Sequence, residues 1–207
     1  MNFSLEIGPH TNLETLPAIK DVYITFLPGG DFNETASKAN ELVKKGFNPI
    51  PHFPARSIKN DPQLKEYVSR CKDAGVKQAL VIGGSRDPVG DFDSSIQLLE
   101  TGYFEEMKIG IAGHPEGSPD ISDSNLEKAM KDKKPYADYI VTQWLLDPQL
   151  IIDFISKQSV PVHVGITGPL KITSLIKFAN IVGAKNSINF LKSNFSKALD
   201  LMKPRDP

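Results

Sequence analysis

Several short apolar runs of this 207-residue chain contain or precede residues that can do chemistry. Glu6 lies inside the apolar segment Phe3–Ile7, where burying a carboxyl group is costly unless it has a partner or a task. If Glu6 points into a partly buried site, burial raises its pKa and suits it to general acid catalysis; otherwise it faces solvent on a frayed strand. Gln143 follows another apolar run and offers an acceptor oxygen and an NH₂ donor to a flat heterocycle. Trp144 beside it can stack on such a ring or fill the core.

Three of the four histidines also lie at or just beyond the ends of apolar runs: His10, His52 and His114. The fourth, His163, lies within such a run. A single histidine is more often structural than catalytic. Three histidines at equivalent positions make a shared functional site as good an explanation as structural roles. Metal binding is a rival role, although the chain has neither a His-x-His pair on its first apolar run nor a His-Glu-x-x-His helix.

Two glycine pairs, Gly29–Gly30 and Gly83–Gly84, follow apolar runs as well. Glycine lets a backbone approach a ligand closely, and its exposed amides can hold phosphate, although turns need glycine for their own sake. Lys128 and Lys131 are the basic candidates for a diphosphate, and their alternative role is to make an exposed helical face soluble.

The apolar runs have the length and composition of β-strands. They are Phe3–Ile7, Val22–Leu27, Pro49–Phe53, Ala79–Ile82, Lys108–Ala112, Tyr139–Thr142 and Val160–Ile166. Helical spacing of apolar residues occurs in Glu34–Lys45, Gln63–Ala74, Leu126–Lys131, Leu150–Lys157 and Ile172–Val182. Strand starts are about 20 to 30 residues apart, the length that a strand and a crossover helix require.

Local signals agree with these boundaries. Gly46 and Gly75 follow helices, where a left-handed cap favours glycine. Asp61-Pro62 and Asp147-Pro148 each place a capping carboxylate before proline at a helix start. A continuous apolar strand such as Ala79–Ile82 indicates burial on both faces of a parallel sheet.

The alternation predicts one α/β domain over residues 1–207, of the (β/α)8 TIM-barrel type, with its site at the C-terminal ends of the strands. Seven strands are recognisable and the eighth is missing, because Asn186–Leu201 has helical spacing. Either the sequence is truncated at its C-terminus, or another chain completes the barrel, or the last strand has an unrecognised pattern. A doubly wound sheet is the alternative fold, but no glycine-rich dinucleotide turn follows the first strand.

The composition narrows the classes of function. Hydrophobic residues make up 40% and the net charge is -1, so a folded domain is expected, with no global field that attracts nucleic acid or anionic lipid. The single cysteine, Cys71, excludes an internal disulfide and is expected to be a buried structural thiol. No signal peptide and no apolar run of about 18 to 20 residues is present, so a cytoplasmic protein is expected.

The residues at the strand ends form an ordered set over nearly the whole chain. They are Ser4–Pro9, Tyr23–Thr25, Ile50–His52, Val81–Gly84, Ile111–Glu116, Val141–Trp144 and Gly165–Ile166. Each motif is short, but their order and spacing resemble the methylenetetrahydrofolate reductase family, the flavin-dependent barrel enzymes of one-carbon metabolism.

The resemblance implies an enzyme with FAD as cofactor and NAD(P)H as reductant. It would reduce 5,10-methylenetetrahydrofolate to 5-methyltetrahydrofolate for methionine biosynthesis. Glu6 is similar to the family's catalytic acid, and Gln143 to the glutamine that contacts both pterin and nicotinamide. The positions implied to contact substrate are Thr25, Ser85, Asp87 and Gln143. The positions implied to hold FAD are Thr25, His52, Gly83, Gly84, Phe92, Ala112, His114, Asn125 and Lys128.

The chain departs from the family at three positions, which follow two of these strands. Ser85 stands where the family has an aspartate, and Asp87 comes two residues later. His114 replaces a common tyrosine, and Ser118 replaces a histidine. These departures bear on the affinity for FAD.

Three other functions stay open. The chain can be a shortened barrel that works as a partner-dependent or non-catalytic subunit. It can be a metal-dependent hydrolase that uses His10, His52 and His114, the rim histidines. It can also be a pterin-binding barrel that passes methyl groups to a corrinoid. The expected ligands are a folate substrate and a nicotinamide nucleotide. The chain is also expected to form a homo-oligomer or to bind a partner subunit.

Overall fold

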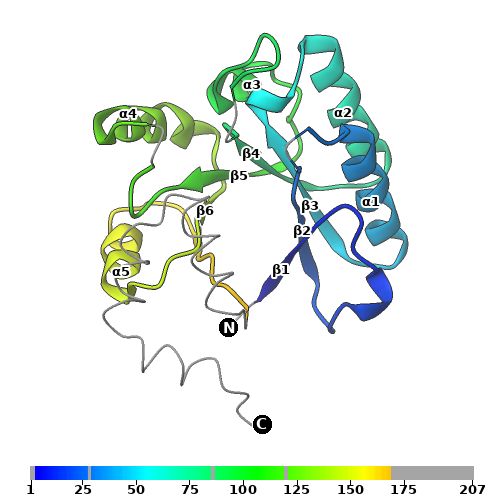
Figure 1. Cartoon of the computed structure of the whole chain (residues 1–207), viewed down its shortest axis with the longest axis horizontal. Coiled ribbons are helices and arrows are strands. Elements are labelled where there is room, and N and C mark those ends of the chain that lie inside the picture. The colour runs from blue at the N-terminus through cyan, green and yellow to red at the C-terminus, as the bar shows by residue number, and fades with distance from the viewer. Residues whose placement is uncertain (1–2, 28, 85–86, 119–120, 169–207) are drawn as a thin grey trace, which may run out of the picture. The chain divides into compact units, whose positions relative to one another are not determined.

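The computed structural model describes residues 3–27, 29–84, 87–118 and 121–168 (Figure 1). Within these residues, seven strands form a sheet in chain order. The strands are Ser4–Ile7 (β1), Asp21–Ile24 (β2), Asn48–Pro54 (β3), Gln78–Ile82 (β4), Lys108–Gly113 (β5), Tyr139–Thr142 (β6) and Val162–His163 (β7). The α-helices are Phe32–Lys44 (α1), Asp61–Asp73 (α2), Ser95–Glu100 (α3), Asp123–Lys133 (α4) and Pro148–Ser156 (α5). Short 3-10 helices cover Leu13–Thr15 (η1), Ala55–Ser57 (η2) and Lys134–Tyr136 (η3).

The pairings of β1 with β2, β2 with β3, β3 with β4, β4 with β5 and β6 with β7 are all parallel. Parallel strands in chain order, joined by helices, are the architecture of a TIM-barrel-type α/β fold, and the predicted fold class is confirmed. Helix α3 was not predicted, and β7 is shorter than the predicted strand. The predicted helices Ile172–Val182 and Asn186–Leu201 lie outside the described residues, as does the end of the chain where an eighth strand would belong.

The chain divides into two compact units, which are described separately. Unit 1 comprises residues 1–111 and 133–138, and unit 2 comprises residues 112–132 and 139–207. The expectation of one domain over residues 1–207 stays a prediction.

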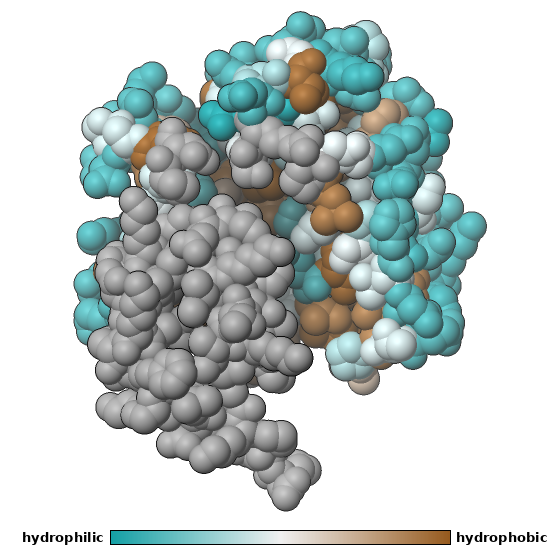
Figure 2. All heavy atoms as spheres, viewed as in Figure 1, coloured by the Kyte–Doolittle hydropathy of each residue, from teal (hydrophilic) through white to brown (hydrophobic). Residues whose placement is uncertain are grey.

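In unit 1, α1 and α2 cover one face of the first strands, and their outer surfaces are largely hydrophilic (Figures 1 and 2). The buried face of α2 carries Leu64, Tyr67, Val68 and Cys71, the i, i+3, i+4, i+7 spacing of an amphipathic helix. Each fully buried side chain of this size contributes about 1.5 to 3 kcal/mol. Cys71 is buried, so the expectation of a buried structural thiol is confirmed, and this burial raises its pKa to about 12.

The ends of helices α1 and α2 are set by capping residues. Gly46 and Gly75 have φ angles of 82° and 88°, so both predicted left-handed caps are confirmed. The predicted start of α2 is shifted by one residue: Asn60, not Asp61, is the N-cap, and its side chain accepts from the Gln63 N–H. Asp61 and Pro62 occupy the first turn, where an acid and a proline are both favourable.

In unit 2, β6 pairs with β7, and the Gln143 N–H donates to the Gly113 carbonyl over 3.0 Å. Helix α5 begins after Asp147, whose side chain accepts from the Gln149 N–H, so that predicted helix start is confirmed. A Cβ atom on Gly113 would stand 2.6 Å from Ile140 Cγ2 and 2.8 Å from Phe154 Cζ. Unit 2 therefore needs glycine at the end of β5.

None of the helices in the described part of the chain is both long and apolar enough to cross a membrane.

We predict that Gly113→Ala lowers the free energy of unfolding by about 1 to 3 kcal/mol, because the new methyl group overpacks the contact of Ile140 with Phe154. Urea unfolding followed by circular dichroism measures this loss. Gly83→Ala is the matched control, since nothing lies within 4 Å of a Cβ atom there. Equal stability of the two variants would contradict the packing of β5 described above.

Candidate functional site

The register of the first three strands places Glu6 and His52 on the same face of the sheet. Glu6 pairs with Tyr23, and Tyr23 pairs with Ile50. Side chains at equivalent positions of neighbouring parallel strands point to the same side, and side chains two residues apart on one strand do so as well. His52 follows Ile50 by two residues and therefore shares the face of Glu6.

The two side chains approach closely. Glu6 Oε2 lies 3.8 Å from His52 Nε2. Burial lowers the pKa of His52 to about 4, so its imidazole is neutral near pH 7 and the contact is not an ion pair. Among the described residues, His52 Nε2 has no hydrogen-bond partner, although it is buried. A buried nitrogen in this state is suited to a hydrogen bond from or to a ligand.

Glu6 is less enclosed than His52. Its side chain is 58% exposed, but the atoms packed around the carboxyl group raise its pKa by desolvation. Because water reaches more than half of the side chain, screening limits this effect. The result is a carboxyl group that is reachable from solvent and holds its proton to a higher pH than a free glutamate.

Two tyrosines hold His52 in place. The Tyr23 ring meets the imidazole edge-on, with ring centres 6.2 Å apart. The buried Tyr67 hydroxyl donates to the His52 carbonyl over 2.9 Å. The sequence indicated Tyr67 as part of the apolar face of a helix, but nothing in its spacing indicated this hydrogen bond.

The end of β4 leaves room beside the backbone. The Arg56 N–H donates to the Gly83 carbonyl over 2.9 Å, which ties the loop after β3 to the end of β4. A Cβ atom on Gly83 would have no heavy atom within 4 Å. Gly84 has a φ of 94°, a conformation that other residues rarely adopt.

The remaining predicted residues of unit 1 differ in their placement. Thr25 lies two residues beyond Tyr23, is half-buried, and donates its N–H to the Ile7 carbonyl over 2.9 Å. Asp87 is exposed, whereas Phe92 is buried at 8% exposure. Ser85 lies outside the described residues. The ligand contacts assigned to these four positions stay predictions.

Unit 2 brings together two of the predicted residues. His114, which follows β5, places Nδ1 2.9 Å from Oε1 of Gln143, which follows β6. Gln143 Nε2 is buried and has no hydrogen-bond partner among the described residues. Ala112 precedes this pair on β5 and is half-buried.

The predicted residues of α4 do not join that pair. Asn125 is exposed. The Lys128 side chain is 79% exposed, and its Nζ lies 3.8 Å from Asp132 Oδ2, one helical turn away. This is the arrangement of a solvent-facing lysine, and the contact assigned between Lys128 and FAD stays a prediction.

Within the described residues, no group of three or more His, Cys, Asp or Glu side chains lies close enough together to hold a metal ion. His10, one of the rim histidines, lies 3.5 Å from Glu34 Oε2, and its side chain is 69% exposed.

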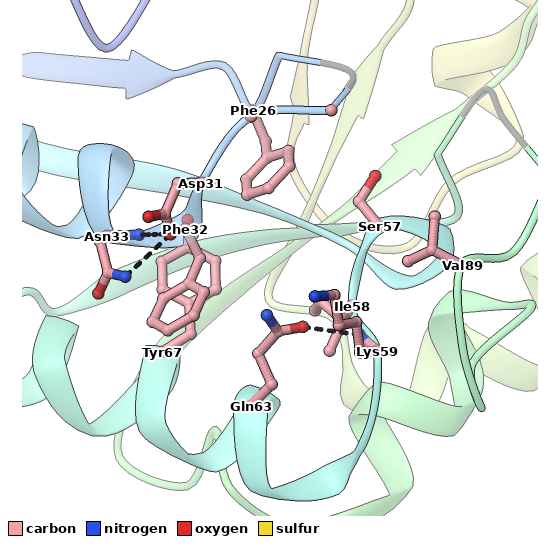
Figure 3. Close-up of a pocket in the computed structure, with 12 residues that line it drawn as sticks. Phe26, Asp31, Phe32, Asn33, Ser57, Ile58, Lys59, Gln63, Tyr67 and Val89 are labelled. Atoms are coloured by element: carbon pink, nitrogen blue, oxygen red, sulfur yellow. Dashed lines mark hydrogen bonds between the residues drawn. The ribbon is translucent and has the colours of Figure 1, made fainter.

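A pocket of about 480 Å³ lies in unit 1 beside the loops that follow β2 and β3 (Figure 3). Phe32 and Tyr67 form one wall, with ring centres 5.4 Å apart. Gln63 lies across from Phe26 and accepts the Lys59 N–H over 2.7 Å. The lining residues are Phe26, Gly29, Gly30, Asp31, Phe32, Asn33, Ser57, Ile58, Lys59, Gln63, Tyr67 and Val89. The glycine pair at residues 29 and 30 therefore borders this pocket. None of the described residues that line it is a predicted folate or flavin contact.

Among curated proteins, the chain is similar to a reductase of fission yeast. It is 26% identical over 191 residues to Methylenetetrahydrofolate reductase 1 of Schizosaccharomyces pombe, and the match covers 82% of this chain. The matched region is 31% of the yeast protein, so the chain spans less than a third of the length of that relative. No protein-family model matches the chain.

Among solved structures, the fold is similar to that of a phosphonomutase from Burkholderia cenocepacia J2315. The TM-score is 0.56 with 11% sequence identity, and the match covers 95% of this chain and 94% of the other. At this identity the likeness concerns the fold alone.

We predict that the neutral, buried His52 makes the protein lose stability in acid. The folded-state pKa of about 4 lies below the unfolded value of 6.5, so the unfolded chain takes up a proton first as the pH falls. The stability that depends on a neutral His52 is fully present above pH 6.5 and is lost as the pH falls from 6.5 to 4. The loss in the free energy of unfolding amounts to about 3 kcal/mol.

Urea unfolding at pH 7.5, 5.5 and 4.5 tests this prediction. His52→Asn should lose less stability than the parent protein over this range. His10→Asn, at an exposed position, should behave as the parent does. If all three proteins show the same pH dependence, the burial of a neutral His52 is wrong.

Proposed function

We propose that the chain is a flavin-dependent reductase that converts 5,10-methylenetetrahydrofolate to 5-methyltetrahydrofolate with NAD(P)H as the reductant. The observation that carries the proposal is Glu6, a carboxyl group of raised pKa at the end of β1, 3.8 Å from a neutral histidine. The similarity to a protein named methylenetetrahydrofolate reductase over 82% of the chain supports the same function. A role in one-carbon metabolism and a cytoplasmic location are part of this proposal.

The residues at the ends of β3 and β4 fit a flavin nucleotide. His52 Nε2 is a buried nitrogen that lacks a partner among the described residues, and the space beside Gly83 is open. His52, Gly83 and Gly84 would therefore hold FAD in unit 1, and Thr25 lies on the face of the sheet that carries Glu6. In unit 2, Ala112 and His114 are the corresponding candidates. When bound, FAD would supply the hydride, which it takes from the nicotinamide.

Glu6 would act as the general acid of the folate half-reaction. Its proton goes to N10 of methylenetetrahydrofolate as the bond between N10 and the bridging carbon breaks, and N10 keeps the electron pair. The bridging carbon is left as an iminium on N5, and addition of a hydride there gives the methyl group. An acid for this step must be protonated when the substrate arrives, and a raised pKa favours that state.

Gln143 would contact the heterocycle of the substrate. Its buried Nε2 needs an acceptor, and the pterin and the nicotinamide carboxamide both provide one. The same side chain would then serve both half-reactions in turn, as expected where the two substrates share one position.

A second candidate is a barrel that needs a partner subunit. In unit 2, Ile152 and Ile155 of α5 are 58% and 41% exposed, and Ile166 is 68% exposed. Exposed large apolar side chains of this kind favour contact with another protein surface. This candidate predicts that the chain binds flavin or is soluble only when its partner is present.

We expect the purified protein to bind FAD and to show flavin absorption bands. Anaerobic NADH or NADPH should bleach these bands, and methylenetetrahydrofolate should restore them. A protein that stays colourless after FAD is added would favour the partner-dependent subunit or a flavin-free folate-binding barrel.

We further expect Glu6→Gln to slow reoxidation by methylenetetrahydrofolate at least a hundredfold, since general acid catalysis contributes about 10² to 10⁴ in rate. Flavin reduction by the nicotinamide should change little, because that step needs no acid. Stopped-flow absorbance separates the two steps. Equal losses in both would contradict the assignment of Glu6 as the acid.

A further inference from the structure

The ends of β5 and β6 are fixed side by side in unit 2. The Gln143 N–H donates to the Gly113 carbonyl over 3.0 Å, which aligns the residues that follow each strand. His114 Nδ1 then lies 2.9 Å from Gln143 Oε1. Because an amide oxygen only accepts, the hydrogen of this bond belongs to His114 Nδ1.

We propose that His114 is a positioning residue that fixes the orientation of the Gln143 amide, so that Nε2 is offered to an acceptor atom of the ligand. The amide has two ends of opposite character, and without a fixed neighbour it can turn by 180° and offer either end. His114 holds the oxygen, which leaves the NH₂ group as the end that must find a partner. That group is buried and has none among the described residues.

This orientation selects the ligand by its hydrogen-bonding edge. A carbonyl oxygen or an unprotonated ring nitrogen can accept from Gln143 Nε2, whereas an N–H group at the same place would meet another donor. The site therefore takes flat heterocycles or carboxamides that present an acceptor. The link to folate and nicotinamide rests on the proposed function; the orientation of the amide does not.

The residue type at position 114 matters for this selection. A hydroxyl group, such as that of the tyrosine common there in the resembled family, both donates and accepts, and it can hold an amide in either orientation. A histidine that donates from Nδ1 holds only one. The exchange of tyrosine for histidine thus narrows the set of ligand edges that Gln143 can read.

Nitrogen-15 NMR of the full-length protein tests the orientation without any ligand. In its neutral form, the His114 imidazole should carry its proton on Nδ1 and not on Nε2. An imidazole that loses the Nδ1 proton while Nε2 keeps its own would overturn the proposal, since a bare Nδ1 would face the NH₂ end of the amide.

Three variants test the consequence for binding. His114→Asn places a side-chain NH₂ close to the position of Nδ1, His114→Asp places only an acceptor there, and His114→Phe keeps a ring that can neither donate nor accept. Calorimetry with folic acid, which carries a carbonyl acceptor on its pterin, compares each variant with the parent, and His114→Asn should keep the most affinity of the three. His114→Phe and His114→Asp should bind about tenfold more weakly, the scale of one hydrogen bond.

The result separates this inference from the proposed function. Equal binding by the Asn, Asp and Phe variants would overturn the positioning role. If the parent protein shows the Nδ1–H imidazole but does not bind folic acid, the proposed substrate fails while the amide orientation stands. Circular dichroism of each variant checks that it is folded, so that a loss of binding is not a loss of structure.

Discussion

The contact between Glu6 and His52 depends on one constraint, the in-register parallel pairing of β1, β2 and β3. Glu6, Tyr23 and Ile50 occupy one row across these strands, and His52 lies one step further along the same face. A slip of one residue in either pairing would turn Glu6 or His52 to the opposite face. Strand β3 resists such a slip because its residues from Pro49 to Pro54 are buried on both faces, so either face would lose its packing.

The same desolvation acts in opposite directions on the two members of this pair. Removing water disfavours the charged form of any group, so it raises the pKa of Glu6 and lowers that of His52. Both shifts favour a neutral pair, in which neither member stabilises a charge on the other. The raised pKa of Glu6 therefore comes from desolvation and needs no nearby anion, and the exposed side of its carboxyl group leaves it reachable from solvent.

The sequence predicted the elements better than their contacts. Local sequence was enough for β4 and for two helix ends. The continuous apolar run at residues 79–82 predicts a buried strand, and the glycines at 46 and 75 predict left-handed caps. Helix α3 escaped prediction because a six-residue helix is too short to show periodicity. At the start of α2, Asn60 and Asp61 are both good caps by residue type, and the structure uses Asn60, whose side chain accepts the Gln63 N–H.

The site residues were predictable as positions at strand ends, because a parallel sheet collects these ends at one edge. Their partners were not. The distance from Glu6 to His52 depends on two successive strand registers, and the bond from Tyr67 to the His52 carbonyl depends on how α2 packs on β3. The pocket bordered by Gly29 and Gly30 is lined from three different loops, the helices α1 and α2, and the 3-10 helix η2. No local pattern encodes such a combination of distant segments.

His52 Nε2 and Gln143 Nε2 show where packing alone does not account for the residues. Each nitrogen is buried, belongs to a residue near the C-terminal end of a strand, and lacks a hydrogen-bond partner among the described residues. An apolar side chain would serve stability better at either position, since an unsatisfied buried nitrogen costs about 1 to 3 kcal/mol. A chain that keeps a polar group at such a cost gains something other than stability from it. Under the proposed function, the gain for these two nitrogens is a hydrogen bond to a ligand, which would supply the partner that the described residues do not.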